Sequence, residues 1–218
     1  KISTNGVSNP NSIVDVNGCI NTNTIILNDP PTLNSTLTPF DVSCSGSCDG
    51  EIISNISGGI SPYEYQWSNL QSSNNTSNLC AGFYSLNIID ENGCKDSVGA
   101  IINEPISISI FIDSTANITA YDSIDGYIYI SSSGGSGALN TQWTDINGFS
   151  STSEDIDNLS AGIYYLEITD TNSCLYLDTF ELTQPSSLWM SIDSISNTSC
   201  YDSCNGSIHI TADGGDSI

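Results

Sequence analysis

A pattern that recurs every 75 to 80 residues constrains the fold of this 218-residue chain more than any other feature. A turn of the form Asp-x-Asn-Gly/Ser-Cys begins at Asp15, Asp90 and Asp170, which are 75 and 80 residues apart. Repeats of this length indicate a tandem array of similar folding units. Other landmarks recur with nearly the same spacing: a proline at Pro30, Pro105 and Pro185, a Gly-Gly pair at Gly58, Gly134 and Gly214, and a tryptophan at Trp67 and Trp143.

The spacing divides the chain into four segments. Residues 34–105 and 106–185 each hold a complete repeat, residues 1–33 hold the end of a preceding repeat, and residues 186–218 hold the start of a following one. The pattern is incomplete at both ends, so we expect the chain to be part of a longer protein.

Alternation of apolar and polar residues with a period of two predicts short β-strands within each repeat. About seven short strands in fewer than 80 residues are typical of an Ig-like β-sandwich, with Trp67 and Trp143 in the core. Tyr84 and Tyr164 occupy the position of a tyrosine corner. We therefore expect an all-β chain of tandem Ig-like β-sandwiches in an extended array. The same alternation predicts sets of residues that share one face of a strand: Tyr63, Tyr65 and Trp67; Tyr84, Leu86 and Ile88; and Tyr164, Leu166 and Ile168. It also predicts that Ile208, Ile210 and Ala212 face inward.

The charge excludes several classes of function. Two lysines, no arginine and 25 acidic residues give a net charge of −23. Binding to nucleic acid depends on Lys and Arg, so we expect no nucleic-acid partner. No apolar run approaches the 18 residues that a membrane-spanning helix needs, so we expect no membrane insertion in this segment. The single histidine, His209, is predicted on an outward strand face and has no basic partner, so we expect no enzyme.

Several motifs of the first complete repeat resemble the SprB repeat. They are CSGSCDG (44–50), GGISPYEYQWS (58–68), NLCAGFY (78–84) and DENGC (90–94), followed by Glu104 and Pro105. The second complete repeat departs from this pattern, because it lacks three of the four cysteines. The resemblance implies a very large surface adhesin of gliding and related Bacteroidota, exported by the type IX system and displayed on the cell surface.

The eight cysteines allow three interpretations. Zinc binding would use Cys44, Cys48 and Cys80 with a fourth ligand, but the spacing is unusual for a zinc site. A redox catalyst needs a thiolate stabilised by a positive charge or a helix, and the sequence offers neither. Structural disulfides are favoured.

The sandwich topology predicts which cysteines pair. Cys44, Cys48 and Cys80 are expected at one end of a sandwich, and Cys94 at the other end, about 20 Å away. The Cα atoms of a disulfide lie within about 7 Å, so Cys94 should not reach Cys44 in its own repeat. The end that carries Cys44 faces the next repeat, where Cys174 occupies the position of Cys94. We therefore predict Cys48–Cys80 within a repeat, Cys44–Cys174 between repeats, and partners outside these 218 residues for Cys19, Cys94, Cys200 and Cys204.

Two further kinds of site are predicted from short motifs. Asp49, Asp90 and Asp170 allow a calcium hypothesis, and solvated Asx turns are the alternative. No other cofactor is expected. Four triplets that begin with Asp-Ser, in which an apolar residue or a threonine follows the serine, resemble an O-glycosylation signal of Bacteroidota. The predicted glycosylation sites are the serines Ser97, Ser114, Ser123 and Ser194.

These observations predict a structural or adhesive shaft segment of a secreted bacterial surface protein or filament, with repeats rigidified by disulfides. The alternative is a glycan- or protein-binding adhesin module with its ligand site on loops, such as residues 140–157, or on a sheet face. The expected partners are neighbouring repeats of the same chain, surface glycans or other copies of the chain.

Overall fold

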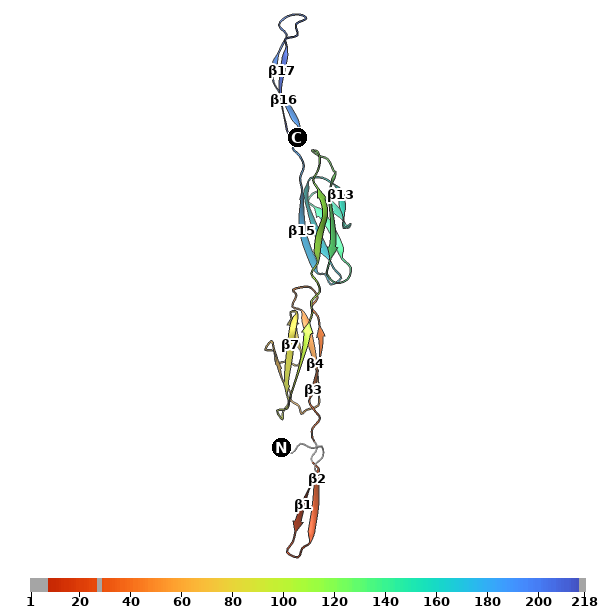
Figure 1. Ribbon diagram of the computed structural model, residues 1–218, viewed down its shortest axis with the longest axis vertical. Helices are drawn as coiled ribbons and strands as arrows, with labels where there is room; N and C mark the ends of the chain where they lie inside the picture. The colour runs from red at the N-terminus through yellow and green to blue at the C-terminus, as the bar shows by residue number, and fades with distance from the viewer. Residues whose placement is uncertain (1–7, 27–28, 216–218) are drawn as a thin grey trace. The chain divides into compact units, whose positions relative to one another are not determined.

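A computed structural model describes residues 8–26 and 29–215, which form strands, turns and loops without an α-helix (Figure 1). The chain divides into two compact units. The first comprises residues 1–42 and 46–104, and the second comprises residues 43–45 and 105–218. The predicted all-β class with Ig-like sandwiches is confirmed. The division into four repeat segments stays a prediction.

The first unit contains a sandwich of two three-stranded antiparallel sheets, which we call the first sandwich. The strand orders are β3–β4–β6 and β5–β7–β8. The strands are β3 (Asn34–Phe40), β4 (Gly50–Ser57), β5 (Glu64–Trp67), β6 (Thr76–Leu79), β7 (Gly82–Ile89) and β8 (Lys95–Ile102). The buried core consists of Leu33, Val42, Ile52, Trp67, Leu79, Leu86, Ile88 and Ile102.

The second unit contains the second sandwich, with strand orders β9–β10–β13 and β12–β11–β14–β15. The strands are β9 (Ser109–Ala116), β10 (Gly126–Ser133), β11 (Asn140–Asp145), β12 (Ser150–Ser151), β13 (Ile156–Leu159), β14 (Gly162–Thr169) and β15 (Leu175–Leu182). The buried core consists of Ile108, Ile118, Ile128, Ile130, Trp143, Ile156, Leu159, Tyr164, Leu166, Ile168 and Leu182.

Each unit also contains a two-stranded hairpin. These are β1 (Ser8–Val14) with β2 (Ile20–Ile26), and β16 (Trp189–Ser196) with β17 (Ser207–Asp213). The prediction that Ile208, Ile210 and Ala212 face a core is wrong, since Ile208 and Ile210 are 65% and 54% exposed and Ala212 is exposed too. Among the described residues, β16 and β17 pair only with each other, so no second sheet covers them.

The tyrosine corners form in both sandwiches as predicted. The Tyr84 hydroxyl donates a hydrogen bond to the Cys80 carbonyl at 3.0 Å. The Tyr164 hydroxyl donates to the Ser160 carbonyl at 2.9 Å. Each corner fixes the segment that enters the central strand of its sheet.

The Gly-Gly pairs are required by a close backbone approach. Gly58 and Gly134 have φ angles of 70° and 89°, a region that favours glycine. A β-carbon at Gly58 would overlap the Thr32 carbonyl, and one at Gly134 would overlap the Ser107 carbonyl. The turn after β4 and the turn after β10 therefore have the same construction.

Candidate functional site

The loop between β3 and β4 carries Cys44 and Cys48 and is held by residues at the end of β8. The Gly46 amide donates a hydrogen bond to Glu104 Oε2 at 2.7 Å. The Val42 amide donates to the Asn103 carbonyl at 3.2 Å, and the Asn103 amide donates to Asp41 Oδ1 at 2.8 Å. The two cysteines are therefore presented on a loop with a defined conformation.

The first disulfide joins Cys48 to Cys80, which are 32 residues apart. Cys80 directly follows β6, and its carbonyl is the acceptor of the tyrosine corner. The bond thus connects the β3–β4 loop to the segment before β7.

The turn between β14 and β15 presents Cys174. Asp170 Oδ1 accepts hydrogen bonds from the Asn172 and Cys174 amides at 2.8 and 2.9 Å, and Asp170 Oδ2 accepts one from the Ser136 amide at 2.7 Å. Burial raises the pKa of Asp170, but these backbone donors outweigh it, so its pKa lies below the ordinary value. The ionised carboxylate organises the turn.

The turn between β7 and β8 has the same construction around Asp90. Its carboxylate accepts hydrogen bonds from the Cys94 amide at 2.8 Å and from the Asn92 and Ile60 amides at 3.0 Å. Here too, burial raises the pKa of Asp90, but the backbone donors lower it by more, so the pKa lies below the ordinary value.

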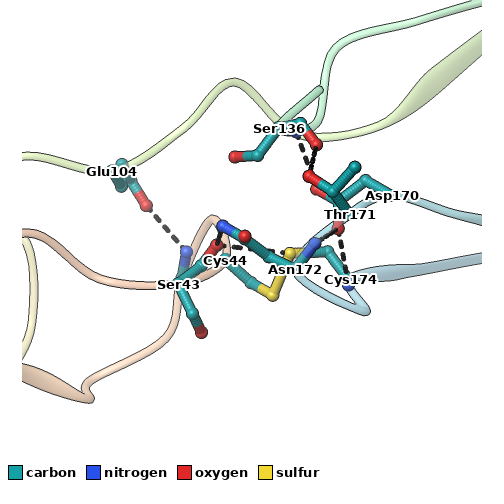
Figure 2. Close-up of a disulfide and its surroundings, with 9 residues drawn as sticks. Ser43, Cys44, Glu104, Ser136, Asp170, Thr171, Asn172 and Cys174 are labelled. Atoms are coloured by element: carbon teal, nitrogen blue, oxygen red, sulfur yellow. Dashed lines mark hydrogen bonds between the residues drawn. A yellow bond between two sulfur atoms is a disulfide. The ribbon is translucent and has the colours of Figure 1, made fainter. Parts of the chain in front are cut away.

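The second disulfide joins Cys44 to Cys174 across 130 residues of sequence, with Cα atoms 5.6 Å apart. Figure 2 shows the bond beside a side-chain contact, in which Asn172 Nδ2 donates to the Ser43 carbonyl at 3.0 Å. Residues 43–45 belong to the second unit, whereas residues 42 and 46 on either side of them belong to the first. The chain therefore passes between the two units at 42–43, 45–46 and 104–105.

The structure thus brings together the same two cysteine pairs that the topology predicts. Four other cysteines, Cys19, Cys94, Cys200 and Cys204, are free and exposed. Their pairing with partners outside these residues stays a prediction. The two disulfides cross-link the chain covalently at the β3–β4 loop.

The second sandwich has no disulfide at the positions that match Cys48 and Cys80, which are Ile124 and Ser160. Its β9–β10 loop is held by hydrogen bonds and by the buried side chain of Ile118. The Asp122 amide donates to Gln184 Oε1 at 2.9 Å, and the Thr183 amide donates to Asn117 Oδ1 at 3.0 Å. These bonds match the contacts of Gly46 with Glu104 and of Asn103 with Asp41 in the first sandwich.

Sequence reasoning missed the clamp made by Glu104 and Gln184. The signal was present, because each residue directly precedes a repeated proline, Pro105 or Pro185. The contact of Asn172 with Ser43 was also missed, although Asn172 lies in the repeated Asp-x-Asn turn.

The calcium hypothesis stays untested. Asp90 and Asp170 accept backbone hydrogen bonds, which gives these carboxylates a structural role. Asp49 also has an interaction partner. Within residues 8–26 and 29–215, no three His, Cys, Asp or Glu side chains are grouped as metal ligands.

Three of the predicted glycosylation serines, Ser97, Ser114 and Ser194, are exposed, and Ser123 is half-buried. Their modification stays a prediction.

Comparison with known proteins identifies part of the chain. The family model described as SprB repeat matches residues 36–72. These residues are therefore similar to the SprB repeat. The SprB match covers β3, β4 and β5 of the first sandwich, and it confirms the resemblance predicted from the motifs. Among curated proteins, no relative matches the chain.

The chain is also similar to several solved structures. One is Dpr2 Ig1-Ig2 in complex with DIP-Theta Ig1-Ig3, with 10% identity, a TM-score of 0.31, and coverage of 76% of this chain and 70% of that chain. A structure described as the basis for Dscam isoform specificity has 11% identity, a TM-score of 0.29, and coverage of 78% and 52%. Murine CEACAM1b has 12% identity, a TM-score of 0.28, and coverage of 69% and 100%. No helix in the described part of the chain is long and apolar enough to span a membrane.

Proposed function

We propose that this chain is a structural, adhesive shaft segment of a very large secreted bacterial surface protein, and that the disulfide between Cys44 and Cys174 lets the shaft bear tension. The SprB repeat at residues 36–72 supports a surface-adhesin role. The bond between Cys44 and Cys174 is the observation that carries the proposal. It adds a covalent connection between residues 34–105 and residues 106–185 besides the chain itself.

The covalent path explains why this bond matters for a shaft. When the two ends of the chain are pulled apart, force passes from Cys44 directly to Cys174. The residues between them, which include β4 to β14, then lie outside the loaded path. A shaft built this way resists lengthening even where a sandwich unfolds.

Single-molecule force spectroscopy on the oxidised chain tests the proposal. Reduction should release the 130-residue segment and add roughly 450 Å of extension, because an extended chain spans at most about 3.3–3.6 Å per residue. Cys44→Ser should have the same effect without reduction. Replacing Cys48 and Cys80 by serine is the matched control, since both lie inside the bypassed segment and the oxidised extension should not change. Equal extension of the oxidised and reduced chains would contradict a tension-bearing role.

Export through the type IX system, display at the cell surface, a place in gliding motility and assembly into a filament belong to the same proposal. Neighbouring repeats are the proposed partners, with surface glycans or other copies as further ones. Calcium is a proposed ligand because a net charge of −23 favours divalent counterions. A melting temperature unchanged by EDTA would argue against calcium. We propose no catalytic role for these residues.

A further inference from the structure

The free edge of β5 borders a groove of the first sandwich. The groove has a volume of about 720 Å³ and is lined by the strand itself, by the turn that follows it and by Asn87 of β7. β5 is an edge strand, because within residues 8–26 and 29–215 it pairs only with β7. An edge strand presents unpaired backbone groups that can accept another strand.

The hydrogen-bond pattern identifies which backbone groups point into the groove. The Ser68 amide donates to the Ser85 carbonyl of β7, and the Trp67 amide donates in the opposite direction, to the Gln71 carbonyl. Directions alternate along a strand, so the backbone N–H and C=O of Tyr65 point away from β7. In the described residues, no backbone bond outside the sheet ladder reaches Tyr65.

Leu70 is the most unusual residue of this groove. It has a φ angle of 68° and its side chain is 95% exposed. A left-handed conformation is strained for leucine, and full exposure gives no packing energy in return. The matching turn of the second sandwich uses Gly148, with a φ angle of 99°. Both are the fourth residue of a turn in which the first amide donates to the fifth carbonyl, Trp67 to Gln71 in one case and Asp145 to Phe149 in the other. In the first sandwich, the Leu70 amide also donates to the Trp67 carbonyl. The first sandwich therefore keeps an apolar side chain where the turn favours glycine.

The corresponding strand of the second sandwich, β11, provides an internal comparison, because it pairs with β12 as well as with β14 and is therefore not an edge strand. Its groove is smaller, about 420 Å³, and is lined mainly by polar residues, among them Asn140, Thr141 and Glu154. The combination of a free edge and an exposed leucine is thus specific to the first sandwich.

Charge indicates which kind of strand the groove accepts. Glu64 lines the groove and is exposed. A second copy of this chain would bring a further net charge of −23 with only two lysines, and like charges disfavour such a contact. A basic segment would instead be attracted.

We propose that the β5 edge groove binds an extended, basic segment of a partner protein by strand addition. The partner backbone pairs with Tyr65, an apolar side chain of the partner packs on Leu70, and a Lys or Arg lies near Glu64. This inference goes beyond the proposed shaft and does not depend on the disulfide between Cys44 and Cys174.

Titration of the isotope-labelled 218-residue chain with a short synthetic peptide of alternating lysine and valine tests the proposal by NMR. We expect the Tyr65 amide to shift and to gain protection from hydrogen exchange, while the Thr141 amide does neither. Leu70→Gly should weaken binding about tenfold, since burial of a leucine side chain contributes a comparable factor, and it should preserve the turn. Ile146→Gly, which removes an 80% exposed side chain from the matching turn, is the control and should not change the affinity.

Three results would overturn the proposal. The first is an unshifted Tyr65 amide at saturating peptide. The second is equal affinity for a peptide of alternating glutamate and valine. The third is concentration-dependent self-association with Tyr65 protected in the absence of peptide, which would make a second copy the occupant.

Discussion

The two sandwiches close the same end in different ways. The first uses the Cys48–Cys80 disulfide, whereas the second has Ile124 and Ser160 at those positions. The second compensates with packing, because its core has eleven buried apolar residues against eight in the first. It also has aromatic contacts of Trp143 with Phe180 and of Phe149 with Tyr164, at centroid distances of 5.3 and 5.4 Å. The second sandwich thus lacks the cross-link and has the larger core.

Removing a large core side chain should have the largest effect, and it should be confined to the second sandwich. Trp143→Ala removes a fully buried indole that also donates to the Glu154 carbonyl. We expect a loss of about 3–5 kcal/mol in the free energy of unfolding, measured by hydrogen exchange of β14 amides. Ile146→Ala is the control, because its side chain is exposed. Equal loss of protection in β7 would show that the two sandwiches unfold together.

Removing the disulfide should affect the first sandwich to a slightly smaller extent. Replacement of both Cys48 and Cys80 by serine releases a loop closed over 32 residues. We expect a loss of about 3 kcal/mol, seen as faster hydrogen exchange of β4 and β7 amides. Cys94→Ser changes a free, exposed cysteine and should have no effect. Unchanged exchange in the double variant would mean that the smaller core suffices alone.

Introducing the disulfide into the second sandwich tests whether a cross-link still stabilises the sandwich with the larger core. With Ile124→Cys and Ser160→Cys together, we expect a new bond at the matching positions and a gain of about 2 kcal/mol, since engineered disulfides deliver less than native ones. Thermal unfolding with and without reductant measures the gain. If the bond forms and the gain is absent, packing has already fixed this end of the sandwich.

Acid should destabilise both sandwiches, because each contains the same buried aspartate turn. The folded-state pKa of Asp90 and of Asp170 lies below the ordinary value of an aspartate. A depressed pKa contributes stability that is present above the unfolded-state value and is lost as the pH falls through the folded-state pKa. We expect both sandwiches to lose stability together below about pH 4. Asp170→Asn should make the second sandwich less stable at pH 7 and less sensitive to acid. A separate acid transition for one sandwich in the unaltered chain would contradict this expectation.

Much of the fold follows from local signals in the sequence. Strand alternation, the Asp-x-Asn turns and the tyrosines near the start of β7 and β14 each specify structure through neighbouring residues. The inward faces of Ile208 and Ile210 were mispredicted, because alternation says which residues share a face but not whether a second sheet covers it.

The candidate site was predictable only in part. The cysteine pairs followed from topology, since disulfide geometry leaves few alternatives once the ends of a sandwich are known. The β5 edge groove was not predictable. The left-handed φ angle of Leu70 depends on a turn closed by Trp67 and Gln71, and no leucine pattern in the sequence signals it.

Peptide mapping of the native protein without reduction directly tests whether the two disulfides form. We expect one cross-linked peptide that contains Cys44 and Cys174, and a second that contains Cys48 and Cys80. A peptide that links Cys44 to Cys94, or one in which Cys174 carries a free thiol, would contradict this expectation.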